Sequence, residues 1–175
     1  MRILAAAVLA LCAIPSGSMA DRPKVSRAVM KSVEEGLDGR LQKLWANDPN
    51  PVQVLGLTQG MYIGGYGAVF MSEVNLAPGA GITPFHPKVT PDEVKRIHEK
   101  KLARIAQLKD TMAEMLLSTA KSLDTVPPDE QVTLGISLFY WNWENSAGLP
   151  GQIVMHAPRR ALVEGQPAKL VTEEY

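Results

Sequence analysis

Apolar residues are densest between Tyr66 and Leu76, a stretch whose one charged residue is Glu73. Alternation places Ala68, Phe70, Val74 and Leu76 on one side of an extended chain and Val69 and Met71 on the other. A strand that is apolar on both sides typically lies inside a sheet with both faces covered. We therefore expect this stretch to be the central strand, with the rest of the chain packed on it.

Two segments show helical spacing. Apolar residues recur every three or four positions from Val25 to Leu44, which predicts an amphipathic helix from Lys24 to Trp45. Thr90 as N-cap, Pro91 at the first helical position and Glu93 three residues after the cap form a capping box. They begin a second predicted helix, from Pro91 to Leu123. Its expected apolar seam is Val94, Ile97, Leu102, Ile105, Leu108, Met112, Met115, Leu116 and Leu123.

The second helix is longer than the strand it is expected to cover. It would span about 50 Å at 1.5 Å per residue, whereas the central strand would cover about 36 Å at 3.3 Å per residue. We therefore expect the helix to overshoot the sheet, and the seam at Met115 and Leu116 to need a cover. The N-terminal helix is the first choice, and a homodimer through the 91–123 helix is the second.

The remaining strand-like runs complete an α+β domain. Val52 to Thr58 is one predicted strand, followed by a turn at Gln59-Gly60. Met61 to Ile63 then leads through a bulge or bend at Gly64-Gly65 into the central strand. Further strands are predicted over Gln131–Trp141 and Gln152–Ala157, and a short helix over Pro158–Glu164, with no prediction for 165–175. The order is α-β-β-α-β-β. We expect one domain, with a mixed or antiparallel sheet packed with two helices.

The first twenty residues have the pattern of a secretory signal peptide. Arg2 gives a positive start, Ile3 to Ile14 is an apolar run, and Ser18-Met19-Ala20 places small residues where signal peptidase reads them. The run is shorter than the roughly 20 residues that span a bilayer. We therefore expect cleavage after Ala20 and a periplasmic or secreted domain over residues 21–175.

Cysteine usage and charge narrow the class of protein. Cys12, the one cysteine, lies inside the apolar run. A lipoprotein signal needs a small residue immediately before its cysteine, and that position is Leu11 here. The mature chain would therefore hold no disulfide and no thiolate site, which suits a bacterial periplasm. The chain has 18 basic and 18 acidic residues, so its formal net charge is zero. This balance argues against general nucleic-acid binding, which depends on a basic surface.

None of the three histidines belongs to a motif with known chemistry. His98-Glu99 begins the H-E-x-x-H zinc motif, but Leu102 stands where the second histidine is needed. A site made of His86, His156 and a carboxylate follows no spacing rule. We therefore predict neither a metal ion nor a cofactor.

Glu73 is the carboxylate closest to the predicted apolar layer, because it shares a strand face with Val69 and Met71. Burial raises the pKa of a carboxyl group, which is how general acids are made. An ion pair with Arg159 or Arg160 would explain the residue equally well. A structural role is the preferred interpretation, and Glu73 with His156 is the weaker, catalytic one.

The cluster Trp141-Asn142-Trp143-Glu144 resembles a contact surface. Aromatic side chains beside amide and acidic groups suit a sugar ring or an extended peptide, and tryptophan is common in interface hot spots. Trp141, Trp143 and Glu144 are therefore binding candidates. The competing interpretation, which we prefer, turns both tryptophans inward to cap the core at the end of the sheet.

Several stretches resemble exported bacterial proteins of an uncharacterised family. They are Tyr66–Phe70 with Glu73-Val74, the long charged helix, Leu149–Val154 and Ala157–Arg160. The resemblance implies export and a single α/β domain, and it brings no activity. The sequence therefore favours a non-enzymatic binding or assembly component of the cell envelope. The alternative is a small envelope hydrolase that uses Glu73 with a histidine, either His86 or His156.

Overall fold

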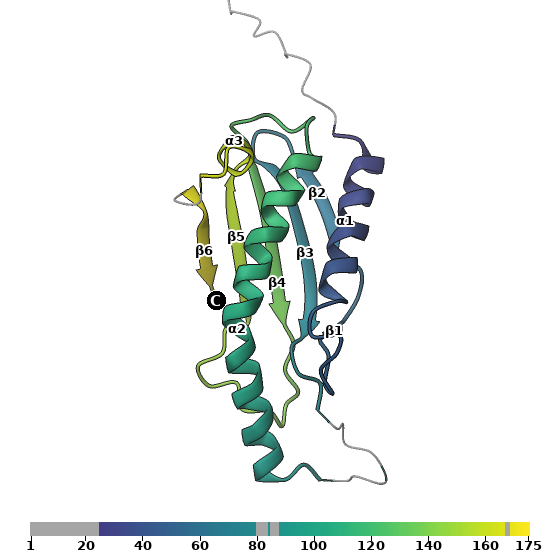
Figure 1. The fold of residues 1–175 in the computed structure, drawn as a ribbon, viewed down its shortest axis with the longest axis vertical. Helices are drawn as coiled ribbons and strands as arrows, with labels where there is room; N and C mark the ends of the chain where they lie inside the picture. The colour runs from purple at the N-terminus through teal and green to yellow at the C-terminus, as the bar shows by residue number, and fades with distance from the viewer. Residues whose placement is uncertain (1–24, 80–83, 85–87, 167–168) are drawn as a thin grey trace, which may run out of the picture.

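A mixed six-stranded sheet with two helices packed on one face forms the body of the protein (Figure 1). The computed structural model describes residues 25–79, 84, 88–166 and 169–175, so the predicted signal peptide lies outside the described residues. The α+β class and the long second helix are confirmed. In chain order the elements are α1 (Arg27–Leu41), β1 (Gln53–Val54), β2 (Gln59–Ile63), β3 (Gly67–Asn75), α2 (Pro91–Ser122), β4 (Gln131–Leu138), β5 (Gln152–Pro158), α3 (Arg159–Val163) and β6 (Val171–Glu174).

β3 is the central strand, as predicted. It pairs with β1 and β2 along one edge and with β4 along the other, and the sheet continues through β5 to β6. The β3–β4 pair is parallel, running from Gly67 opposite Gln131 to Val74 opposite Leu138, and the other pairs are antiparallel. A parallel pair needs a crossover connection, and α2 provides it.

Local signals set the helix starts. Ser26 caps α1 by accepting the Val29 N–H at 3.2 Å. Thr90 and Glu93 form the reciprocal capping box of α2, with Glu93 Oε2 accepting the Thr90 N–H at 2.9 Å. α2 ends within one residue of the prediction, whereas α1 ends four residues before the predicted Trp45 and continues as turns.

The strand boundaries before β3 differ from the prediction. Of the two alternatives at Gly64-Gly65, the bend is right and the bulge is wrong, because the chain turns there between the antiparallel strands β2 and β3. Gly65 and Gly67 adopt φ values of 85° and 135°, which other residues rarely reach. The predicted turn at Gln59-Gly60 is wrong, since both residues belong to β2. The predicted strand over 52–58 shrinks to β1, and its second half is a loop. β6 lies in the segment for which no element was predicted, and it adds a strand at the far edge of the sheet.

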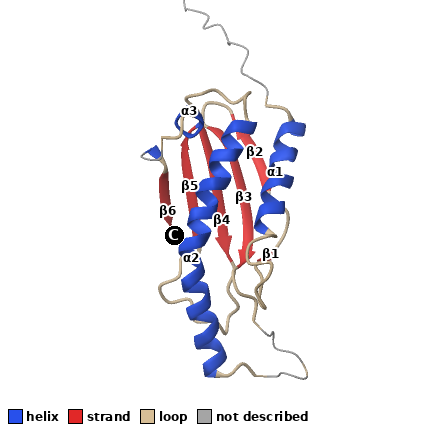
Figure 2. Ribbon diagram, in the orientation of Figure 1, coloured by secondary structure: helices blue, strands red, loops and turns tan. Residues whose placement is uncertain are grey.

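Only one face of the sheet is covered by helices, which corrects the expectation that both faces of the central strand are buried. Figure 2 shows α1 and α2 side by side on the same face. The residues that point toward them are fully or almost fully buried: Ala68, Phe70, Val74, Val132, Leu134, Ile136, Ile153 and Met155. On the opposite face, no helix or strand of the described residues covers the sheet, and we call it the open face.

α2 does overshoot the sheet, but at its N-terminal end (Figure 1). Met115 and Leu116 are fully buried, so the expected shielding is confirmed, with α1 and the sheet as their cover. The seam prediction is wrong at Leu102, which is 51% exposed. Lys101 and Arg104 occupy the inward face of this overhang instead, beneath the loops that follow α1 and β4.

Candidate functional site

The open face presents apolar side chains to solvent, with the most exposed of them on the two edge strands β2 and β6. Met61, Ile63 and Val171 are 54%, 47% and 44% exposed, and Val69, Met71 and Val154 are half-buried. The strand register sets them in rows. The open-face strand positions are Gln59, Met61 and Ile63; Val69, Met71 and Glu73; Thr133, Gly135 and Ser137; Gln152, Val154 and His156; Val171 and Glu173. Exposed apolar side chains that share one uncovered face of a sheet make this face a candidate interaction surface.

Small residues on β4 let neighbouring side chains lie flat across the centre of this face. A Cβ atom at Gly135 would overlap the thioether sulfur of Met71, so Met71 lies over the glycine. Tyr66 lies within hydrogen-bond distance of Thr133, with 3.1 Å between the two hydroxyl oxygens. Thr133 and Gly135 are therefore buried by their neighbours on the open face itself. Met71 covers Gly135 and Tyr66 reaches over Thr133, so neither β4 residue contributes an exposed side chain to this face.

A hollow of about 410 Å³ lies at one side of the open face, where Glu73 meets the loop between β1 and β2. Leu55 and Leu57 of that loop, with Met71 and Ser137, form its walls. Glu73 is exposed, and its carboxylate makes no hydrogen bond or ion pair with any described residue. It is therefore a free negative charge beside apolar side chains.

The suggested ion pairs of Glu73 do not form. Arg160 pairs with Asp129 at 2.5 Å, and the Arg159 Nε donates to the carbonyl of Ala120 at 3.2 Å. Both arginines are bound at the start of α3. The structural interpretation of Glu73 therefore loses the partners that supported it.

The loop that walls the hollow is anchored from below. The buried carboxylate of Asp38 on α1 accepts the Thr58 N–H at 2.9 Å and the Thr58 hydroxyl at 2.5 Å. The Thr58 hydroxyl also lies 2.7 Å from the Ser72 hydroxyl. At the other end of the loop, the Leu55 N–H donates to the Glu73 carbonyl at 2.8 Å. These bonds hold the wall beside Glu73 in place.

The two weak catalytic candidates lie apart. Glu73 aligns with Ser137 and Gln152 across the sheet. His156 is four residues beyond Gln152, so it lies about 13 Å further along the strand direction. Its Nδ1 lies 3.4 Å from Gln131 Oε1. His86 lies outside the described residues. Among the residues that are described, no group of three His, Cys, Asp or Glu side chains comes together to hold a metal ion.

The predicted binding cluster divides among three environments. Trp141 is 46% exposed and packs edge-to-face on Phe139, with 5.0 Å between ring centroids, so its expected inward position is wrong. Trp143 is half-buried near Gly79, beside Ile97 of α2. Glu144 is buried in an ion pair with Lys101. The cluster is therefore not one surface, and its acid is used internally.

Lys101 and Glu144 were not expected to meet, since both look like solvent-exposed residues in the sequence. Burial lowers the pKa of Lys101, against the opposing effect of Glu144. Burial, with the charge of Glu144, raises the pKa of the neighbouring Tyr140 to about 12. The Tyr140 hydroxyl donates to the carbonyl of Pro150 at 2.7 Å. These buried side chains hold the loop after β4 against α2, so we assign the network a structural role.

A second charge cluster fixes the loop after α1 to α2. Asp48 pairs with Lys100 at 2.5 Å and with Arg104 at 2.8 Å. The hydrogen bond from Lys100 is the main reason that the pKa of Asp48 falls to about 2. Arg104 also lies 4.5 Å from the ring centroid of Trp45 and donates to the carbonyl of Asn50 at 2.8 Å. Every cationic group here is already engaged.

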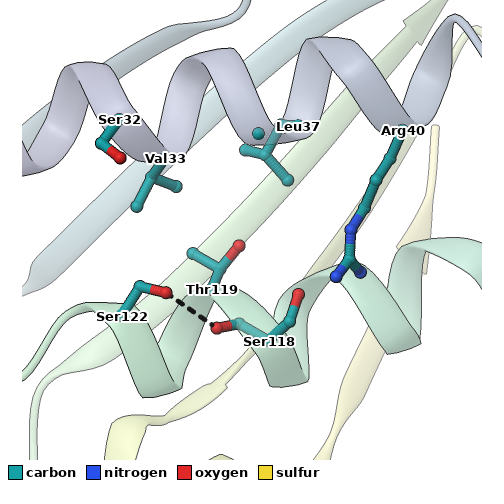
Figure 3. Close-up of a pocket in the computed structure, with 8 residues that line it drawn as sticks. Ser32, Val33, Leu37, Arg40, Ser118, Thr119 and Ser122 are labelled. Carbon is teal, nitrogen blue, oxygen red and sulfur yellow. Dashed lines mark hydrogen bonds between the residues drawn. The ribbon is translucent and has the colours of Figure 1, made fainter.

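A smaller groove of about 150 Å³ lies between α1 and α2. Figure 3 shows the Arg40 side chain reaching from α1 toward α2, with the Thr119 hydroxyl between the helices. Ser118 and Ser122 satisfy their own hydroxyls on carbonyls of α2, the latter as the dashed bond of 3.4 Å. Small residues here let the two helices approach closely, which explains the groove as packing.

Comparison with known protein families, curated proteins and solved structures gives no match to this chain. None of the helices within the described residues has the length and apolar character to cross a membrane. The functional argument therefore depends on the open face and its hollow.

Proposed function

We propose that this protein is a non-enzymatic binding or assembly component of the bacterial cell envelope that binds its partner on the open face. The observation that carries the proposal is the run of exposed apolar side chains on a sheet face that no described element covers. A partner that covers Met61, Ile63 and Val171 would remove apolar surface from water, which favours binding at this face. Export is proposed from the N-terminal sequence pattern.

Both edges of the sheet are poorly suited to pairing with a strand from a partner, which favours binding on the open face. At the β2 edge, Glu34 on α1 accepts the Gly60 N–H at 2.8 Å, and Arg27 donates to the Gly60 carbonyl at 3.4 Å. The ion pair between Arg27 and Glu34 therefore occupies backbone groups that an added strand would need. At the other edge, β6 carries Glu173 and Glu174, and charged side chains discourage edge pairing.

Site-specific photo-crosslinking in the native host tests the proposal. A photoreactive residue at Met61 or Val171 should give a discrete adduct of the exported protein, because both side chains point out of the open face. The same residue at Leu102 is the control, since Leu102 is as exposed but lies on α2. Equal adducts at all three positions, or adducts at Leu102 alone, would count against the open face.

A further inference from the structure

We propose that the hollow at Glu73 receives an arginine or lysine side chain from an apolar segment of the partner protein. This inference rests on the proposed function, because it describes how the partner is recognised on the open face. Three observations carry it: the charges of the open face, the walls of the hollow and the anchoring of its loop.

The charge of the open face selects a basic partner. Among the described residues at its strand positions there are two carboxylates, Glu73 and Glu173, one histidine, and no lysine or arginine. Glu173 accepts the Tyr175 hydroxyl at 2.9 Å. Glu73 is the one of these two carboxylates that has no partner among the described residues. A ligand that leaves Glu73 unpaired would bury a free charge, which is costly.

The walls of the hollow fit a long side chain with an apolar stem. Leu57 is 74% exposed and Met71 is half-buried, and both lie beside the Glu73 carboxylate. Lysine and arginine pack their methylene groups on apolar surface while the charged end reaches an acceptor. A charge-assisted hydrogen bond to a carboxylate is stronger than a neutral one. The hollow, at about 410 Å³, is large enough to admit such a side chain.

The site is formed before the partner arrives. The hydrogen bonds of Thr58 to Asp38 and Ser72, and of Leu55 to Glu73, fix the loop from both ends. Pre-organisation reduces the ordering cost of binding. A second copy of this chain is a poorer occupant, because two open faces would bring carboxylates together with no lysine or arginine between them.

Two synthetic peptides test the inference on the full chain: acetyl-Val-Leu-Arg-Leu-Val-amide and the same peptide with norleucine in place of arginine. Backbone NMR shifts report where each binds, and titration gives Kd. The arginine peptide should perturb Gly56, Leu57 and Glu73 and bind at least about tenfold more tightly than the norleucine peptide, as expected for a charge-assisted contact. Glu73→Gln should abolish that difference, and Glu173→Gln, the matched control, should preserve it.

Each other outcome decides against the inference. If the norleucine peptide binds the open face as tightly as the arginine peptide, charge recognition at Glu73 is wrong and the proposed function stands. If neither peptide perturbs an open-face amide, both are wrong. If light scattering shows a dimer that Glu73→Arg changes, a second copy is the occupant. The melting temperature of Glu73→Gln should equal that of the wild type, because this exposed side chain contacts no hydrogen-bond or ion-pair partner in the described part of the chain.

Discussion

The Lys101 ammonium and the Glu144 carboxylate form an ion pair that solvent hardly reaches, with side chains 1% and 2% exposed. Lys101 also donates to the carbonyl of Phe139 at 3.0 Å and lies 4.7 Å from the ring centroid of Tyr140. Lys101 of α2 thereby contacts three residues of the loop that follows β4. The part of α2 that extends beyond the sheet has no strand beneath it to provide apolar contacts. The buried ion pair of Lys101 and Glu144 packs this part of the helix instead.

Breaking one half of this pair should be costly. Lys101→Met leaves Glu144 buried without a counter-charge, and we expect a loss of about 3–5 kcal/mol in the free energy of unfolding. The double variant Lys101→Met/Glu144→Leu should recover most of that loss, since no charge is then buried. Lys109→Met, which breaks the more exposed pair with Glu174, is the control and should cost at most about 1 kcal/mol. Urea unfolding measures all three, and a double variant as unstable as the single one would contradict this account.

The ion pairs of Asp48 should contribute to the free energy of unfolding in a way that depends on pH. The pKa of Asp48 is lowered from 3.8 to about 2 in the folded protein. A lowered folded-state pKa contributes stability above the unfolded value, and that contribution is lost as the pH falls from about 4 toward 2. The stability difference between the wild type and Asp48→Asn should therefore shrink over this window. Denaturant unfolding at several pH values checks it, and a difference independent of pH would show that the two cationic partners do not stabilise the carboxylate.

Gly67 should be hard to replace. A Cβ atom at this position would overlap the backbone of Gln131, and φ is 135°. Gly67→Ala should cost at least about 3 kcal/mol, because a clash within the parallel ladder adds to backbone strain. Gly65→Ala is the matched control: φ is 85° but the added atom meets open space. It should cost about 1–2 kcal/mol. Equal melting temperatures for the two variants would refute the steric argument.

The seam residues of α2 above the sheet should not tolerate charge. Replacing both Met115 and Leu116 with Glu should unfold the protein, because both are fully buried. Leu117→Glu, at a position 36% exposed, should leave the circular dichroism spectrum unchanged. Light scattering of the wild type tests separately whether the 91–123 helix forms a homodimer. Such a dimer would have to use other residues of the helix, because α1 and the sheet already cover Met115 and Leu116.

Export predicts a defined N-terminus. Protein recovered from the envelope of its native host should begin at Asp21, because Ser18-Met19-Ala20 precedes it with small residues at the cleavage positions. Intact mass spectrometry measures this directly. A chain that retains Met1 and stays in the cytoplasm would remove the basis for an envelope function.

Signals confined to a few residues were readable from the sequence. The capping box at Thr90 and Glu93 placed the start of α2, and the alternating apolar pattern located the central strand β3 without showing that only one of its sides is covered. Glu73 was identified as the acid nearest the apolar layer. The exposure of Glu73 was not predicted. The alternating pattern of a strand does not reveal whether helices cover one face of the sheet or both. Lys101 was missed because its buried partner, Glu144, lies 43 residues away, and charge in a helix pattern normally indicates solvent.

The parallel ladder between β3 and β4 has a consequence for the order of folding. It is the one ladder that joins two antiparallel halves, α1 with β1–β3 and β4–β6 with α3, and the whole of α2 separates its two strands. Loop-closure entropy makes such distant pairings slow, while hairpins form early. We therefore expect each half to gain its own strands first and the central ladder to close last.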